Sequence, residues 1–203
     1  MAASIWNWLS GIFSSKESSV VTPTPQSATQ PDPAVLLACR ISMHYEGCPT
    51  DAEGMCIPYL DPARIPTIGF GSTYYEDGSR VSLADAPIPL ARAKILLYRK
   101  MEQFMAIVDQ YVDAPLNQGQ AGALSSFVYN EGPGRFESST MLKYLNAHNY
   151  AGAAGEFPKW DIGGGRRLPG LSERRKTEQI LFETGNLIFY GPGMVVVPEG
   201  SYP

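Results

Sequence analysis

Three polar side chains between positions 46 and 67 have the types and the order that hydrolysis of a glycosidic bond requires. Glu46 ends an apolar stretch, Asp61 lies in the turn sequence YLDPAR, and Thr67 follows Asp61 with five residues between them. Two carboxyl groups can divide acid and base labour only when their surroundings separate their pKa values. Asp61 should stay ionised in its turn and accept a proton from a water molecule that the Thr67 hydroxyl helps to hold. This is the layout of an inverting glycosidase.

Other residues compete for these roles. Asp51 and Glu53 lie between Glu46 and Asp61 and could take the place of Asp61 as the base. A cysteine nucleophile is disfavoured, because His44 would have to face a thiol from a helix end and no third orienting group is evident. We interpret His44 and His148 as ordinary surface residues.

The elements that must position these groups can be read from caps and periodicity. Asp32 is a good N-cap with Pro33 at the first helical position, so a helix should begin there and end near Glu46. Proline, glycine and β-branched residues from 57 to 75 predict short strands in a small antiparallel sheet. The apolar stripe from Pro89 to Val112 predicts a helix of about six turns.

The second half of the chain reads as helical. Asn117 and Gln120 have the form of a capping box that opens another buried helix. Shorter helices are predicted over 138–146, 150–157 and 171–183, and Trp160 is interpreted as a packing anchor. In the tail, the runs LIFY and MVVV surround Gly191, Pro192 and Gly193, which predicts a hairpin packed on the domain.

Composition excludes several classes of protein. The chain has 203 residues, of which 44% are hydrophobic, and a net charge of -4. Its apolar runs are far shorter than the roughly 18 residues of a membrane-spanning helix. No global basic field is available to hold nucleic acid, so an anionic ligand must be met locally. Three cysteines and two histidines exclude a disulfide scaffold and an ordinary zinc cluster.

The first 33 residues differ from the rest of the chain. A Ser-, Thr- and Pro-rich stretch from Ser14 onward reads as a linker. Ahead of it, residues 5–13 have apolar side chains at helical spacing. This fits a helix on a membrane surface or docked on a partner, or else a loosely ordered terminus. The stretch is a poor secretory signal, because no Lys or Arg precedes it. We therefore expect an N-terminal segment and linker over 1–33, a catalytic domain over 34–185 and a tail over 186–203.

Longer stretches of the sequence resemble the phage-type lysozymes, glycoside hydrolase family 24. The matching pieces are HYEG at Glu46, YLDPARIPTIGFGST, NQGQAGALSSFVYNEGPGRFESSTMLKYLN and the closing block with GGGRRLPGLSERRKTE. The resemblance covers roughly Val35 to Glu183. It implies an α+β, lysozyme-like fold, in which a small β-rich lobe and a larger helical lobe are joined by the long helix, with the cleft between them.

The resemblance also implies roles for the three polar residues. Glu46 would be the general acid that protonates the glycosidic oxygen, while Asp61 and Thr67 position and activate the attacking water. One departure is that fourteen residues separate Glu46 from Asp61, more than the family usually has. The extra residues should form a surface loop.

Cys48 and Cys56 bracket this insertion. A disulfide between them would stabilise the fold by about 2 to 3 kcal/mol on the loop-entropy model. A reducing cytoplasm would instead keep two free thiols, and we favour that alternative.

Several further residues are candidates for contact with sugar. Glycines allow close backbone approach to a saccharide, and aromatic side chains can supply apolar walls. The candidates are Gly69, Gly71, Phe127, Asn130, Gly132 and Phe136, although Asn130 reads more readily as a helix C-cap. Tyr129 is a further candidate wall.

The chain has one basic cluster. Arg166, Arg167, Arg174 and Arg175 could meet the carboxylates of peptidoglycan stem peptides. Pairing with Glu173 and Glu178 at helical spacing is the favoured interpretation.

The implied activity is hydrolysis of the β-1,4 bond between N-acetylmuramic acid and N-acetylglucosamine in bacterial peptidoglycan, by a monomer without metal, cofactor or nucleic acid. A lytic transglycosylase and an inactive wall-binding or virion module are the alternatives. The resemblance implies a phage endolysin in the host cytoplasm, which acts in the periplasm once a holin opens the inner membrane, or a lysozyme carried in the virion.

Overall fold

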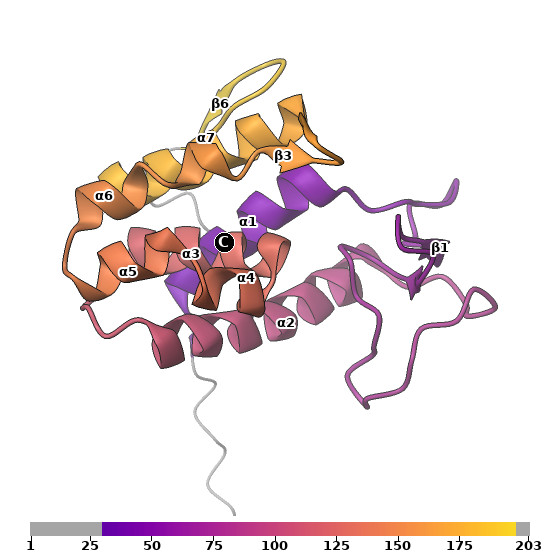
Figure 1. Ribbon diagram of the computed structural model, residues 1–203. Coiled ribbons are helices and arrows are strands. Elements are labelled where there is room, and N and C mark those ends of the chain that lie inside the picture. Colours follow the sequence, from indigo (N-terminus) through magenta and orange to yellow (C-terminus); the bar gives the residue numbers. More distant parts are fainter. Residues whose placement is uncertain (1–29, 198–203) are drawn as a thin grey trace, which may run out of the picture. The chain divides into compact units, whose positions relative to one another are not determined.

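The computed structural model describes residues 30–197 of the chain. Contacts divide the chain into two units, Met1–Gln30 and Pro31–Pro203, and every helix and strand below belongs to the second unit (Figure 1). The surface helix predicted over 5–13 lies outside the described residues. Over the range 30–197, no helix is both long enough and apolar enough to cross a membrane.

The first helix, α1 (Pro33–Glu46), begins and ends as its sequence predicts. Asp32 is the N-cap, and its Oδ1 atom accepts hydrogen bonds from the backbone N–H groups of Ala34 at 2.7 Å and Val35 at 3.3 Å. Gly47 follows with a φ of 68° and a ψ of 172°, a backbone conformation that stops the helix and that glycine adopts without strain. Glu46 is therefore the last residue of α1.

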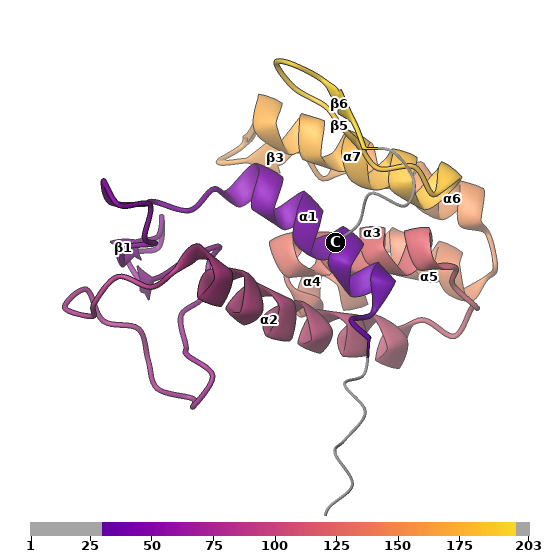
Figure 2. The same cartoon turned by 180° about the vertical axis from the view of Figure 1, so that it is seen from behind.

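A small lobe of strands and turns follows α1. Strand β1 (Tyr59–Leu60) pairs antiparallel with β2 (Pro66–Thr67), so that Tyr59 lies opposite Thr67. Isolated bridges, such as those joining Ile68 to Ser72 and Cys56 to Ile88, extend this pairing. Figures 1 and 2 show the lobe beside the C-terminal end of α1 and the N-terminal end of α2 (Leu90–Tyr111). The predicted antiparallel sheet is confirmed.

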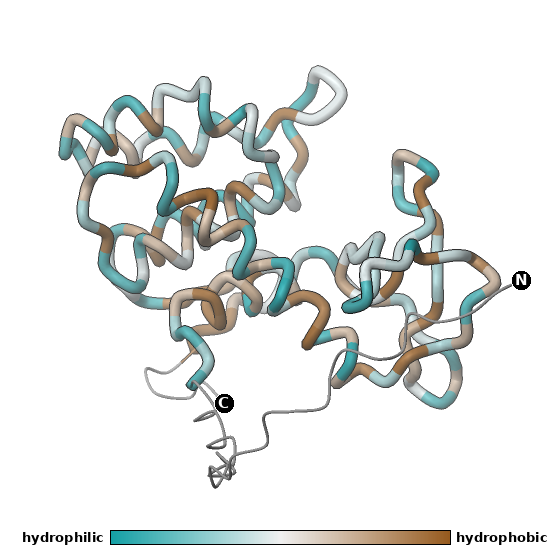
Figure 3. The backbone as a smooth tube through the Cα atoms, turned by 90° about the horizontal axis from the view of Figure 1, so that it is seen from below, coloured by the Kyte–Doolittle hydropathy of each residue, from teal (hydrophilic) through white to brown (hydrophobic). Residues whose placement is uncertain are grey.

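The larger lobe is built around α3 (Gln118–Glu131), which contacts α1, α2 and α7 (Pro169–Thr184). The predicted capping box is present: Gln120 N–H donates to Asn117 Oδ1 at 2.9 Å, and Asn117 N–H donates to Gln120 Oε1 at 3.0 Å. The long helix α2 matches its predicted bounds closely. Brown and teal alternate along the helices in Figure 3, as expected for helices with one buried face.

The rest of the larger lobe contains α4 (Pro133–Glu137), α5 (Thr140–Asn146), α6 (Tyr150–Ala154) and a 3-10 turn, η1 (Phe157–Lys159). The expectation that the second half is all α is wrong between η1 and α7. There, β3 (Ile162–Gly163) and β4 (Arg166–Arg167) form an antiparallel hairpin. Its two turn residues, Gly164 and Gly165, both have positive φ, which is the requirement of a type I′ turn.

The described part of the tail packs against the C-terminal end of α1. Strands β5 (Ile188–Phe189) and β6 (Val195–Val196) pair antiparallel. The Phe189 ring stacks on His44 with 4.2 Å between ring centroids. The Tyr45 hydroxyl oxygen lies 2.7 Å from Thr177 Oγ1 and 3.1 Å from the Tyr190 carbonyl oxygen. The hairpin thus ties the last turn of α1 to α7.

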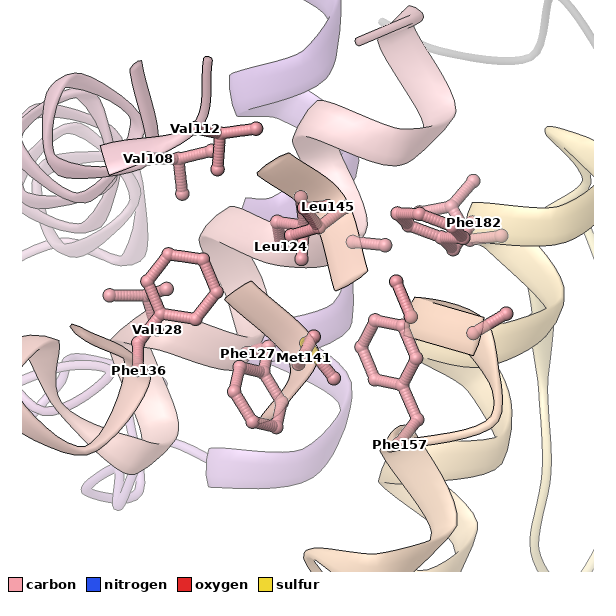
Figure 4. Close-up of a cluster of buried hydrophobic side chains, with 14 of the residues drawn as sticks. Val108, Val112, Leu124, Phe127, Val128, Phe136, Met141, Leu145, Phe157 and Phe182 are labelled. Carbon is pink, nitrogen blue, oxygen red and sulfur yellow. The ribbon is translucent and has the colours of Figure 1, made fainter. Parts of the chain in front are cut away.

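Two groups of buried side chains form the core. The larger group fills the helical lobe around Phe127 and includes Phe136 and Phe157 (Figure 4). The Phe127 ring meets these two rings and that of Trp160 edge-on at centroid distances of 5.1 to 6.3 Å. The smaller group lies between α1, α2 and the strand lobe, and includes Ile68 and Phe70. Both lobes therefore rest on α2.

Gly69 offers a test of how closely the strand lobe packs on α2. Its φ is +61°, and a Cβ atom there would lie 2.9 Å from the Cβ of Ala93. Gly78 also has a positive φ, +81°, but a Cβ atom at Gly78 would meet nothing within 4 Å. We expect Gly69→Ala to cost about 1 to 3 kcal/mol more unfolding free energy than Gly78→Ala, because only the first adds overpacking to backbone strain. Urea unfolding of both variants measures this, and equal losses would contradict it.

Candidate active site

Glu46 is held at the surface by a buried cation. Its side chain is 31% exposed, and its Oε1 atom accepts a hydrogen bond from Arg174 NH1 at 2.5 Å. Arg174 lies on α7, which contacts α1, and its own side chain is only 2% exposed. The carboxyl group at the end of α1 is thus fixed from inside the protein while one side stays open to solvent.

Arg174 joins three helices. Its Nε donates to Glu178 Oε1 at 3.1 Å, and its NH2 group lies 3.3 Å from Ser42 Oγ on α1 and from the Ser126 carbonyl oxygen on α3. Burial disfavours the guanidinium charge, but the carboxylates of Glu178 and Glu46 outweigh burial and hold the pKa of Arg174 above its usual value. The cation is therefore permanent.

Arg175 is buried beside it. Its NH1 atom lies 3.0 Å from Glu178 Oε2, and its NH2 group donates to Asn130 Oδ1. Burial lowers the pKa of Arg175, against the opposing effect of Glu178. The favoured interpretation of the basic cluster is confirmed for Glu178, which pairs with both Arg174 and Arg175.

The other two members of the basic cluster, Arg166 and Arg167, are exposed. Arg167 NH1 bonds Asp161 Oδ2 at 2.5 Å, and Arg166 is exposed on β4. Arg174 and Arg175 are too deeply buried to reach a stem peptide.

Asp61 and Thr67 meet at the backbone of one residue in the β1–β2 hairpin. Asp61 Oδ1 accepts from the Ile65 N–H at 2.8 Å, and the Thr67 hydroxyl donates to the Ile65 carbonyl at 2.9 Å. Asp61 is half-buried rather than fully exposed, and Thr67 is 1% exposed. Because the Thr67 proton is already donated, its hydroxyl oxygen can only accept a further bond.

Tyr59 is a residue near the candidate site that sequence reasoning missed. Its pKa is raised by burial first and then by the negative charges of Glu46 and Asp61, so both carboxylates act on one hydroxyl. Its hydroxyl donates to the Gly69 carbonyl at 3.4 Å. The charges of Glu46, at the end of α1, and of Asp61, in the β1–β2 hairpin, thus both act on Tyr59.

Lys100 is a second residue that sequence reasoning missed. It is half-buried on α2, and its Nζ donates to the Gly71 carbonyl at 2.7 Å and lies 5.3 Å from the Tyr129 ring centroid. Burial lowers its pKa, and the charge of Glu46 partly restores it. The sequence held no pattern to mark it, because a lysine in an amphipathic helix normally faces solvent.

Among the candidate sugar contacts, the two phenylalanines are buried in the core, and the asparagine and glycine residues have other surroundings. Phe127 and Phe136 are both 0% exposed, so the expectation that they line a saccharide site is wrong; they are core residues. Asn130 is not a helix C-cap, since α3 continues to Glu131 and Gly132 is the cap. Gly132 has a φ of +88° with open space at its Cβ position. Gly71 allows close packing, because a Cβ there would lie 2.6 Å from the Tyr129 hydroxyl.

The inserted loop after Glu46 is closed on itself. Cys48 and Cys56 form a disulfide with 6.3 Å between their Cα atoms, so the preference for two free thiols is wrong. Asp51 Oδ1 accepts from the backbone N–H groups of Glu53 at 3.1 Å and Met55 at 2.8 Å. The Oδ1 atom of Asp51 thus stabilises the turn of the loop.

The third cysteine, Cys39, is a buried free thiol, and burial raises its pKa to about 12.

The fold and the acidic site define a lysozyme-like protein, and the comparisons identify its family. Residues 45–178, more than half of the chain, match the phage lysozyme family. The chain belongs to this family.

Two relatives show how far the similarity extends. The endolysin of Bacillus phage B103 is 43% identical over 119 residues, which are 59% of this chain and 43% of that protein. This chain thus spans less than half the length of that relative. The endolysin of Salmonella phage P22 is 36% identical over 124 residues, which are 61% of this chain and 84% of the relative.

Solved structures give the same fold. A crystal structure of P22 lysozyme has a TM-score of 0.62 at 32% identity, covering 71% of this chain and 94% of its own. The endolysin from Escherichia coli O157:H7 phage FAHEc1 has a TM-score of 0.63 at 28% identity, covering 73% and 92%. The α+β, lysozyme-like fold predicted from the sequence is confirmed.

Glu178 should be essential to the stability of the fold. Replacing it by glutamine leaves two buried guanidinium groups without their shared carboxylate, which costs about 3 to 5 kcal/mol for a buried ion pair that loses one partner. Glu183→Gln on the same helix is the matched control, since Glu183 is exposed and accepts a hydrogen bond from the neutral Gln179 side chain at 3.1 Å. Its cost should stay below about 0.5 kcal/mol. Chemical denaturation compares the two, and similar midpoints would refute the expectation.

Proposed function

We propose that the chain is a muramidase that hydrolyses the β-1,4 bond between N-acetylmuramic acid and N-acetylglucosamine. The observation that carries the proposal is that Glu46 is a partly exposed carboxyl group held by the buried Arg174. Its charge and that of Asp61 both act on Tyr59. Membership of the phage lysozyme family supports this reaction class. Glycoside hydrolysis by two carboxyl groups needs no metal or cofactor.

Glu46 would act as the general acid. Arg174 occupies Oε1, so the proton to be donated belongs on Oε2, which can face the glycosidic oxygen of the substrate. The hydrogen bond from a buried and rigid donor fixes the direction of the carboxyl group. Positioning of this kind lowers the barrier, because the reacting atoms are brought together before the reaction starts.

Asp61 and Thr67 would hold the attacking water. Asp61 Oδ1 is bound to the Ile65 N–H, which leaves the other carboxylate oxygen to accept a proton from water. The Thr67 oxygen can accept a hydrogen bond from the same water, since its own proton goes to Ile65. The two groups are fixed to one another through the backbone of Ile65.

The biological setting follows from the relatives, whose names describe endolysins. We infer that the chain degrades the bacterial wall during host lysis, waiting in the host cytoplasm and acting in the periplasm, or travelling in the virion. Contact of residues 5–13 with a membrane surface, the domain limits given above and a monomeric state are part of the same proposal.

Glu46→Gln tests the role of the acid. Glutamine can still accept the Arg174 hydrogen bond but cannot donate an acidic proton, so hydrolysis should fall about a hundredfold to ten-thousandfold while the fold persists. Glu53→Gln is the control, because Glu53 is exposed in the inserted loop. Clearing of permeabilised Gram-negative cells measures both. Full activity of the Glu46 variant, or loss in the Glu53 variant, would count against the assignment.

The products test the mechanism. An inverting hydrolase requires its two carboxyl groups roughly 6.5 to 9.5 Å apart and converts the β bond into a sugar released first as the α anomer. Proton NMR early in the reaction should therefore show α product, and mass spectrometry should show a free reducing end. A β product would indicate a covalent intermediate, and a 1,6-anhydro end would indicate a lytic transglycosylase.

A further inference from the structure

A hollow of about 320 Å³ lies between α2 and the chain segment that follows the β1–β2 hairpin. Arg99, Lys100 and Gln103 line it from α2, and residues 72–76 line it from the facing segment. Its volume is at the lower end of the range of ligand pockets, which begins at about 300 Å³. Neither carboxyl group of the candidate active site lines it.

The hollow adjoins the candidate active site. Its wall begins at Ser72, whose backbone pairs with Ile68, the residue directly after Thr67. Lys100 at its edge bonds the Gly71 carbonyl and is close enough to Glu46 for that charge to affect its pKa. A ligand bound to the catalytic residues could therefore extend a branch into this hollow.

The charge of the hollow is positive. Arg99 and Lys100 supply two cations, and Glu76 supplies the single carboxylate among its lining residues. Arg92, which lies outside the lining, bonds Glu76 through Nε at 3.3 Å and NH2 at 3.0 Å. Arg92 thus offsets the negative charge of Glu76, on which Arg99 also acts. The lining residues keep a net positive charge, because Arg99 and Lys100 outnumber Glu76.

Donors are also available there. A lysine ammonium group has three N–H donors, and the Gly71 carbonyl takes one from Lys100. Arg99 is exposed, and its guanidinium group carries five N–H donors. Charge-assisted hydrogen bonds to a carboxylate are about twice as strong as neutral ones, so this donor set favours a carboxylate over a sugar hydroxyl.

We propose that this hollow binds a carboxylate of the peptide stem attached to the muramic acid next to the bond that is cut. The proposal rests on the proposed function, because it takes the bound ligand to be peptidoglycan. In this proposal the hollow, and not the buried Arg174 and Arg175, is where stem-peptide carboxylates contact the protein. Because the chain as a whole has a net negative charge, an anionic branch needs a local cationic site such as this one.

The test compares binding of two soluble probes by calorimetry. One is a tetrasaccharide of alternating N-acetylglucosamine and N-acetylmuramic acid that carries tetrapeptide stems, and the other is the same glycan with its stems removed. The Glu46→Gln chain serves as the background, so that neither probe is cleaved. Adding Arg99→Gln should weaken binding of the peptide-bearing probe roughly fivefold at low salt and leave the stripped probe unchanged.

Lys94→Gln is the matched control, since Lys94 is an exposed cation on α2 outside the hollow and should change neither affinity. An equal effect of Arg99→Gln on both probes, or no effect on either, would overturn the proposal. A wild-type chain that cleaves no glycan while its Arg99 dependence is as expected would instead overturn the proposed function and leave the binding site standing.

Discussion

The hydrogen bond between Arg174 and Glu46 is the interaction on which the candidate site depends. It fixes a carboxyl group that would otherwise rotate at the end of a helix. The arginine can do this because it is itself held by groups on α1, α3 and α7. A buried ion pair is weak evidence for stability, since desolvation offsets its attraction. Its value here lies in the geometry that it imposes on Glu46.

The strand lobe is held to the same frame by different means. Asp61 and Thr67 are tied together at Ile65, and the turn that follows them is tied to α2 and α3. Lys100 donates to the Gly71 carbonyl, and the Tyr129 hydroxyl donates to the Phe70 carbonyl. The acid and the proposed base therefore belong to separate lobes that meet on α2, so the distance between them depends on the packing of both lobes.

Local patterns predicted most of the fold, and non-local contacts decided the rest. Caps at Asp32 and Asn117 placed two helices correctly because a cap depends only on its neighbours in sequence. Phe127 and Phe136 were misread as sugar contacts, since nothing local distinguishes a buried aromatic ring from one that lines a site. Tyr59 and Lys100 were missed because Glu46, whose charge acts on both, lies on a different element of the fold. The Cys48–Cys56 disulfide also depends on the path of a loop that spacing alone leaves open.

A crystal structure of the Glu46→Gln chain with a bound peptidoglycan tetrasaccharide tests the central claim most directly. The glycosidic oxygen should lie within about 3.2 Å of the side chain at position 46, with a water molecule between Asp61, Thr67 and the anomeric carbon. A glycan bound elsewhere, or one whose anomeric carbon faces Asp51 rather than Asp61, would contradict the assignment of the acid and the base.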